Sequence, residues 1–103
     1  MSVPTRFALE ARQEYDDAVT WYETRTPGQG FRFIRALRRV FERISTQPDR
    51  WAEIAPGVRS ALVPKWPYNV IYEVHPDHIV LLAVLHTSRD PDVWNDRRRS
   101  LDT

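Results

Sequence analysis

The segment between Thr26 and Pro48 constrains the fold of this chain more than any other feature, because on a helix its residues separate into two faces. One arc is apolar and consists of Phe33, Ile34, Leu37, Val40, Phe41 and Ile44. The other arc is charged and consists of Arg32, Arg35, Arg38, Arg39, Glu42 and Arg43. Pro48 cannot continue the helix. An apolar stripe this wide must be covered by another element, so the segment predicts a helix packed in a core.

A second amphipathic helix is predicted just before it, over Ala8–Thr24. Its apolar stripe consists of Ala8, Ala11, Tyr15, Ala18, Val19 and Tyr22. Trp21 falls outside this stripe. In the connection, we expect Thr26 to be the N-cap of the next helix, with Pro27 at its first position and Gln29 closing a capping box. Two helices joined so closely predict an antiparallel helical hairpin.

The second half of the chain supplies the cover for this hairpin. Three runs rich in β-branched and aromatic residues are predicted as strands: Val58–Val63, Pro67–Val74 and Ile79–His86. The turn at residues 75–78 should join the last two as a β-hairpin, with Val74 opposite Ile79. Alternation from that pair places six residues toward the helices: Tyr68, Val70, Tyr72, Leu81, Ala83 and Leu85. The mixed opposite face is then half exposed or meets a partner.

Short elements complete the expected fold. Ser2–Phe7 is predicted as an edge strand and Pro48–Gly57 as irregular, while Asp90 and Pro91 should cap a short helix that runs through Trp94 to Arg99. The expected fold class is therefore α+β. An N-terminal strand and a two-helix antiparallel hairpin pack on one face of a small antiparallel sheet, and a short C-terminal helix follows. We expect a single domain over residues 1–103.

Composition excludes several classes of function. The chain has 103 residues, a net charge of +1 and no cysteine, which rules out disulfides, thiolate metal sites and a cysteine nucleophile. The longest fully apolar run, Ile79–Leu85, is far shorter than the roughly 20 residues that a membrane-spanning helix needs. The first 20 residues are too charged for a signal peptide. We therefore expect a cytoplasmic protein with no membrane association, no cofactor and no metal.

Six pieces of the chain, in this order, resemble the RelE/ParE superfamily of type II toxin–antitoxin toxins: Ala18–Glu23, Pro27–Phe31, Gln47–Pro48, Val58–Arg59, Trp66–Tyr72 and Ala83–Pro91. The resemblance spans nearly the whole chain and rests on the order and spacing of the pieces. It implies a RelE/ParE-like fold and a small bacterial growth-arrest toxin. It also implies that a cognate antitoxin from the same operon holds this toxin inactive.

The superfamily offers two targets. RelE-like members cut mRNA on the ribosome without a metal, which needs a proton donor or acceptor and cations that stabilise the phosphorane. The residues that could serve here are His86, Arg59, Arg89, Lys65 and Tyr72. The alternation above, however, places Tyr72 away from His86. Because the stretch from Leu85 to Pro91 looks more like the ParE-like branch, we favour inhibition of DNA gyrase, without catalysis, over an mRNA interferase.

Two further surfaces are predicted. The residues expected to contact the target are Trp94, Arg97, Arg98 and Arg99, an exposed aromatic beside a cationic run. The residues expected to contact the antitoxin are Trp21, Arg35, Arg39 and Arg43. Simpler interpretations stay open: a solvated arginine face, a hydrogen-bonded His86 at a strand end, and an Arg89–Asp90 pair that braces a turn. A non-toxic RNA-binding or protein-interaction module is a third possible function.

Overall fold

The computed structural model describes residues 2–90 and 92–101, and for residues 99–101 it describes the backbone only. Pro91, half of the expected helix cap, and the side chain of Arg99 thus lie outside the described part. The elements are β1 (Thr5–Phe7), α1 (Leu9–Arg25), α2 (Gln29–Thr46), β2 (Glu53–Ala55), β3 (Val58–Leu62), β4 (Tyr68–Val74), β5 (Ile79–His86) and α3 (Val93–Leu101). Over these residues, no helix combines the length and apolarity that crossing a membrane requires.

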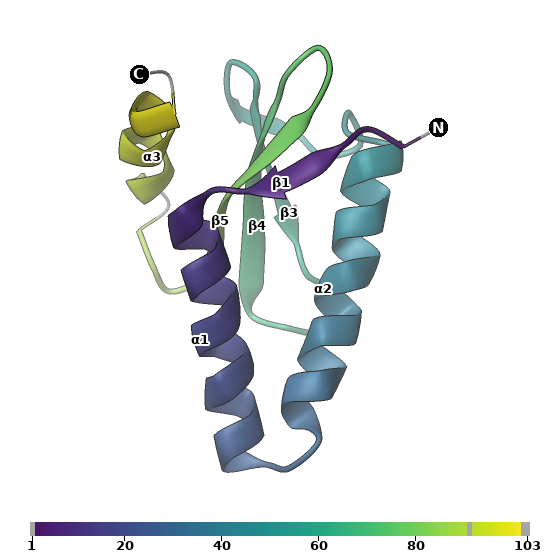
Figure 1. Ribbon diagram of the computed structural model, residues 1–103, viewed down its shortest axis with the longest axis vertical. Helices are drawn as coiled ribbons and strands as arrows, with labels where there is room; N and C mark the ends of the chain where they lie inside the picture. Colours follow the sequence, from purple (N-terminus) through teal and green to yellow (C-terminus); the bar gives the residue numbers. More distant parts are fainter. Residues whose placement is uncertain (1, 91, 102–103) are drawn as a thin grey trace.

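The five strands form one sheet in the order β1-β5-β4-β3-β2, and the α1–α2 hairpin extends well beyond its end (Figure 1). β1 lies at the edge, as expected, but it pairs with β5 in parallel, so the sheet is mixed rather than antiparallel. No local turn joins these two strands, and the sequence therefore carries no signal for their direction. The segment expected to be irregular contributes the short strand β2.

A β-bulge changes the expected pairing of β4 with β5. Val74 lies opposite Ile79 and Tyr72 opposite Leu81, as predicted. Beyond an irregularity between Ile71 and Tyr72, the predicted partners are wrong: Ile71 lies opposite Ala83, Val70 opposite Val84 and Tyr68 opposite His86. Because one residue of slip reverses the faces of a strand, Ala83 and Leu85 turn away from the hairpin and Val84 turns toward it.

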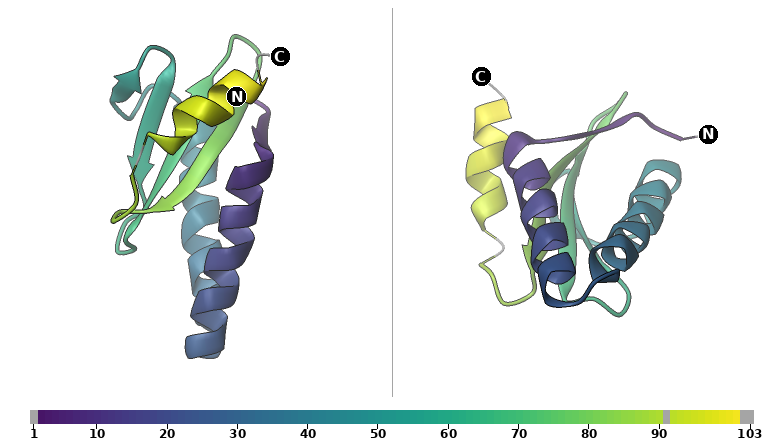
Figure 2. Two further views of the ribbon diagram at one scale, coloured as in Figure 1. Left: turned by 90° about the vertical axis from the view of Figure 1, so that its left-hand side faces the viewer. Right: turned by 60° about the horizontal axis from the view of Figure 1, so that its bottom comes forward.

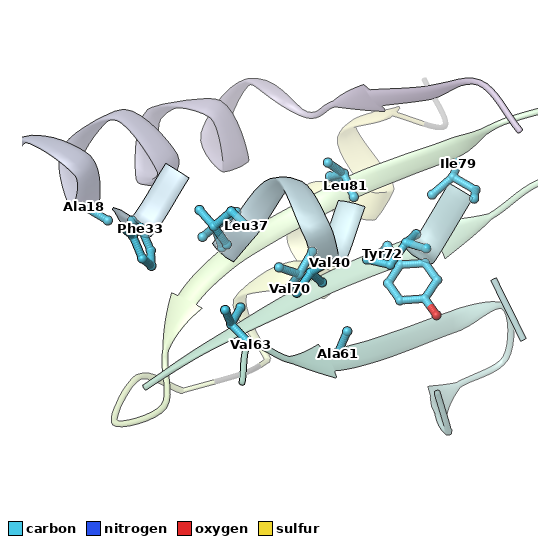
Figure 3. Close-up of a cluster of buried hydrophobic side chains, with 12 residues drawn as sticks. Ala18, Phe33, Leu37, Val40, Ala61, Val63, Val70, Tyr72, Ile79 and Leu81 are labelled. Carbon is cyan, nitrogen blue, oxygen red and sulfur yellow. The ribbon is translucent and has the colours of Figure 1, made fainter. Parts of the chain in front are cut away.

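The main core lies between the helical hairpin and the sheet (Figure 3). Leu37 and Phe33 of α2 are fully buried over Val70 and Tyr72 of β4. The remaining buried members are Ala18, Val40, Ile44, Ala61, Val63, Ile79, Leu81 and Val84. Tyr15, Tyr22 and Phe41, which we expected in this core, are half-buried at its margin. The apolar face of α2 is thus covered by the sheet, as its pattern requires.

A second core lies on the opposite face of the sheet, where we expected partial exposure. There α3 crosses the strands on the side away from α2 (Figure 2) and places Trp94 over the sheet. The other buried members are Ala8, Ala11, Val58, Ile71, Val80, Leu82, Ala83 and Leu85. Four residues predicted to pack between the hairpin and the sheet, Ala8, Ala11, Ala83 and Leu85, belong to this cluster instead, and the bulge turns the last two toward α3.

The hairpin connection also differs from the predicted capping box. Gly28, in a left-handed conformation with φ 88°, precedes α2, and no side chain of the connection caps the helix. Instead the Glu23 carboxylate of α1 accepts hydrogen bonds from the amides of Gly28 (2.9 Å) and Gly30 (3.1 Å). A Cβ on Gly30 would lie 2.9 Å from both the Glu23 Cβ and the Val19 carbonyl oxygen, so the two helices approach closely here.

Replacing Leu37 by alanine tests the main core. Leu37 is fully buried between α2 and the sheet, so Leu37→Ala is expected to lower the free energy of unfolding by about 2–5 kcal/mol. Chemical denaturation measures this change. Arg38→Ala, one position along on the exposed face, is the control and should change stability by less than about 0.5 kcal/mol. A Leu37→Ala effect as small as that of the control would contradict this core.

Candidate functional site

A basic groove of about 700 Å³ runs between α2 and the β3–β4 turn. Its cationic lining consists of Arg32, Arg35, Arg39, Arg43, Arg50 and Lys65, and no carboxylate lines it. The α2 members recur at helical spacing because they form the charged arc of that helix. Three of the residues expected to contact an antitoxin, Arg35, Arg39 and Arg43, are therefore brought together. We call this surface the basic groove.

Three arginines of the basic groove have no carboxylate partner among the described residues. The side chains of Arg35, Arg39 and Arg43 make no hydrogen bond or ion pair within the described residues. Arg59 and Arg97, by contrast, are held by Glu53 and Glu14. Unpaired like charges repel one another and favour an anionic partner, so the groove has the electrostatics of a binding surface.

Apolar side chains also line the groove. They are Ala36, Val40, Trp51, Leu62, Pro64 and Trp66. Leu62 is 56% exposed and adds accessible apolar surface to the lining. Lys65 occupies the third position of the turn from Val63 to Trp66 and has φ 72°, a positive value rarely adopted by a residue with a side chain. The groove thus combines cations, apolar surface and a strained turn.

Trp21, the fourth residue expected to contact an antitoxin, lies elsewhere. It is 49% exposed on α1, where the Arg25 guanidinium lies 3.9 Å from the centre of its ring. It lines a separate cleft of about 420 Å³ beside the end of β5, together with His86 and Arg89. The structure therefore divides the expected antitoxin residues between two surfaces, with only the arginines in the basic groove.

The residues that ribonuclease chemistry would need are not brought together. Tyr72 is buried in the main core, and its hydroxyl donates a 2.7 Å hydrogen bond to the Pro48 carbonyl. Arg59, its neighbour across the β3–β4 pair, donates to the carbonyl of Trp51 and to Glu53. Of the remaining three, Lys65 lines the basic groove, whereas His86 and Arg89 share the cleft at the end of β5. This set is spread over three places.

His86 makes the local contacts of a residue at a strand end. Its Nδ1 accepts the Ser88 amide at 3.1 Å and lies 2.8 Å from the Ser88 hydroxyl. Its ring meets the edge of Tyr68 with centroids 5.3 Å apart. Because the amide requires Nδ1 as an acceptor, the neutral ring carries its proton on Nε2. The expected Arg89–Asp90 pair is not formed, since Asp90 instead accepts the Asp92 amide at 2.9 Å.

Three residues of α3 expected to contact a target, Trp94, Arg97 and Arg98, are engaged within the chain. Trp94, predicted to be exposed, is only 9% exposed because the second core surrounds it. Arg98 forms an ion pair with the buried Glu73 and donates to the Pro56 carbonyl at 3.0 Å. The prediction of an exposed aromatic is therefore wrong. A target contact through this helix stays a prediction that the fold does not favour.

Arg97 and Glu14 together provide hydrogen-bond partners for part of the open edge of β5. The sequence pattern did not single out Glu14. β1 covers β5 only as far as Leu81. Beyond it, Glu14 accepts the Val84 amide at 3.0 Å, Arg97 donates to the Leu82 carbonyl at 2.9 Å, and the two side chains join at 2.7 and 2.8 Å. Hydrogen bonding to Glu14 raises the pKa of Arg97 above its ordinary value. The position of Glu14 beside the stripe residues Ala11 and Ala18 was the available signal, since a half-buried carboxylate needs a partner.

The titration of Tyr72 tests whether its hydroxyl is available for chemistry. Burial raises the pKa of Tyr72 from 10.0 to about 12. Between these values the folded chain keeps a proton that the unfolded chain releases. The stabilisation is therefore complete below pH 10 and is lost as the pH rises through 12. Tyr72→Phe should remove the latest step of the tyrosinate absorbance titration and make alkaline unfolding less steep. An unchanged titration would place this hydroxyl in solvent.

Comparison with known proteins agrees with this fold. A family model described as the ParE toxin of the type II toxin–antitoxin system parDE matches residues 5–91. No protein of curated function matches the sequence significantly. A solved structure described as the chromosomal ParDE toxin–antitoxin system from P. aeruginosa superimposes with a TM-score of 0.71 at 16% identity, over 82% of this chain and 96% of that one.

The family match covers most of the chain and includes every strand and both long helices. It agrees with the element order and with the superfamily resemblance carried by the sequence. This chain belongs to the ParE toxin family of type II toxin–antitoxin systems.

Proposed function

We propose that this toxin arrests growth by binding and inhibiting DNA gyrase, without catalysis of its own. The observation that carries the proposal is the separation of the residues that metal-free RNA cleavage would need. A base, a phosphorane-stabilising cation and an acid must converge within hydrogen-bond reach of one phosphate. Here Tyr72 is bonded to a carbonyl in the core and Arg59 to the loop before β2. Neither can reach a substrate beside His86.

A ribosome-dependent mRNA interferase is the second candidate. His86 and Arg89 share the cleft at the end of β5 with Tyr68, so one proton-transfer group, one cation and one aromatic ring do lie near one another. His86 is also half-exposed and carries its proton on Nε2 in the neutral form. This cleft supports ribonuclease chemistry only if these residues suffice without Tyr72 and Arg59.

One experiment separates the two targets. Purified toxin is added to a gyrase supercoiling assay and, in parallel, to programmed ribosomes, with His86→Ala tested beside the parent. We expect inhibited supercoiling, no mRNA cleavage and a His86→Ala variant that inhibits as well as the parent. Ribosome-dependent cuts that fall by about 10²–10⁴-fold in His86→Ala would instead identify an acid or base and overturn the proposal.

Two controls complete this experiment. His78→Ala removes a half-exposed histidine at the far end of β5, and should have no effect in either assay. Thermal unfolding of each variant excludes loss of structure as the cause of an effect. If expression of the toxin leaves growth unchanged in a host with closely related gyrase and ribosomes, both targets fail and the non-toxic module becomes the better description.

As a member of a toxin–antitoxin family, the protein has an antitoxin as its partner. We propose that the antitoxin contacts the basic groove. Arg35, Arg39 and Arg43 lie along one side of α2, unpaired within the described residues, and the lining includes no carboxylate. An acidic segment would neutralise these charges and attract the toxin from a distance.

Charge reversal tests this contact. Arg35→Glu combined with Arg39→Glu should slow association with the antitoxin by about 10-fold or more at low salt and flatten the dependence of the association rate on ionic strength. Stopped-flow mixing over a salt series measures both effects. Arg38→Glu changes the same helix at an exposed position outside the groove and is the control. Because it reverses one charge where the double variant reverses two, a control effect half as large on the logarithm of the association rate would show that only net charge matters.

A further inference from the structure

Lys65 occupies a backbone position that disfavours it. Residues 63–66 form a turn in which the Trp66 amide donates to the Val63 carbonyl at 3.2 Å, with Pro64 second and Lys65 third. The positive φ of its third residue makes this a type II turn, in which glycine is the usual occupant of that position. Lys65, with φ 72°, is the only residue other than glycine with a positive φ in the described part of the chain. The fold alone would favour glycine here.

No contact within the chain explains why a lysine occupies this turn. Lys65 is exposed and makes no hydrogen bond or ion pair with the described residues. Its neighbours on the basic groove are the indole of Trp66, the exposed Leu62 and the arginines of α2. These arginines make its ammonium less favourable still, because like charges repel. Strain and repulsion at one exposed residue indicate a role in binding.

We infer that Lys65 is a recognition residue for an acidic, amphipathic helix of the antitoxin that lies in the basic groove. The inference rests on the antitoxin contact proposed above and adds the residue that lies opposite α2 across the groove. The strained turn holds the ammonium on the wall facing Arg35 and Arg39. An occupant between the two walls can therefore be neutralised from both sides.

The dimensions and chemistry of the groove favour a helix as its occupant. From Arg32 to Arg43, α2 rises about 16 Å, or roughly three turns, which matches the length of a short docking helix. The accessible apolar residues of the lining, the exposed Leu62 and the half-buried Trp51 and Trp66, can receive the apolar face of such a helix. Carboxylates on its flanks would then reach the cations. A single nucleic acid strand would use the cations but would leave the aliphatic surface without a partner.

Four substitutions at Lys65 separate backbone strain from charge. Glycine relieves the strain and removes the charge, asparagine tolerates the left-handed region without the charge, alanine keeps the strain without the charge, and arginine keeps both. Lys65→Gly should therefore raise the melting temperature of the free toxin by about 2–6 °C, whereas Lys65→Ala should not. All four variants are measured in the full chain.

Binding to the antitoxin encoded in the same operon should follow charge alone. We expect Lys65→Gly, Lys65→Asn and Lys65→Ala to weaken binding by about 3- to 10-fold at low salt, and Lys65→Arg to bind as the parent does. The difference should shrink as salt is added. If Lys65→Gly makes the toxin more stable but weakens its binding to the antitoxin, the strained turn is retained for recognition and not for stability.

Each contrary result has a distinct meaning. If the parent binds the antitoxin but Lys65→Gly binds equally tightly, the recognition role is wrong while the toxin–antitoxin contact stands. If the parent does not bind the antitoxin at all, the proposed contact itself fails. A single-stranded DNA 20-mer, long enough to fill a typical single-strand site of roughly 4–16 nucleotides, is titrated in parallel. Tighter, Lys65-dependent binding of this oligonucleotide than of the antitoxin would identify a nucleic acid as the occupant and overturn the inference.

Discussion

The edge of β5 that no strand pairs with, beyond Leu81, is the constraint on which the arrangement of this molecule depends. β5 is almost wholly buried, yet β1 pairs with only its first three residues. The polar backbone groups beyond Leu81 need partners, because a buried amide without a hydrogen bond is costly. Glu14 and Arg97 supply two of these partners, one to the Val84 amide and one to the Leu82 carbonyl, at a place where no strand pairs with β5. This pair joins α1, β5 and α3, so the open edge also fixes where the terminal helix lies.

The same requirement divides the arginines into two groups. Arg97 and Arg98 are paired with Glu14 and Glu73, and Arg59 with the loop before β2, because each lies where burial makes an unpaired charge expensive. The arginines of α2 lie on the exposed face, where water and salt offset their repulsion. Arginine number alone therefore did not identify a binding surface. The distribution of carboxylates is more informative, since none of the described residues that line the basic groove is a carboxylate.

Sequence reasoning predicted the parts of this fold that depend on local pattern. Helical period, β-branched runs and the turn after Val74 are short-range features. They predicted both helices of the hairpin and the strands β3, β4 and β5. The bulge at Ile71, the parallel direction of β1 and the cover provided by Trp94 depend on distant contacts. Likewise the arginines of the groove were predicted from helical spacing, whereas Lys65 joins them only through the fold. Tyr72 and His86 are apart, but not for the predicted reason. The bulge turns His86 to the hairpin side of the sheet, where its ring meets Tyr68, and its distance from Tyr72 lies along the strands.

The strained backbone of Lys65 can be offset by the free energy of binding. A toxin whose antitoxin must bind tightly can keep an unfavourable turn, provided that binding recovers more free energy than the turn costs. The main core lies on the other side of α2 from the groove charges, and Leu37 and Phe33 hold that helix firmly on the sheet. Because α2 is fixed by its apolar face, its charged face can carry repulsion without moving. The proposed acidic partner would meet charges that are already in place, so little reorganisation would oppose its binding.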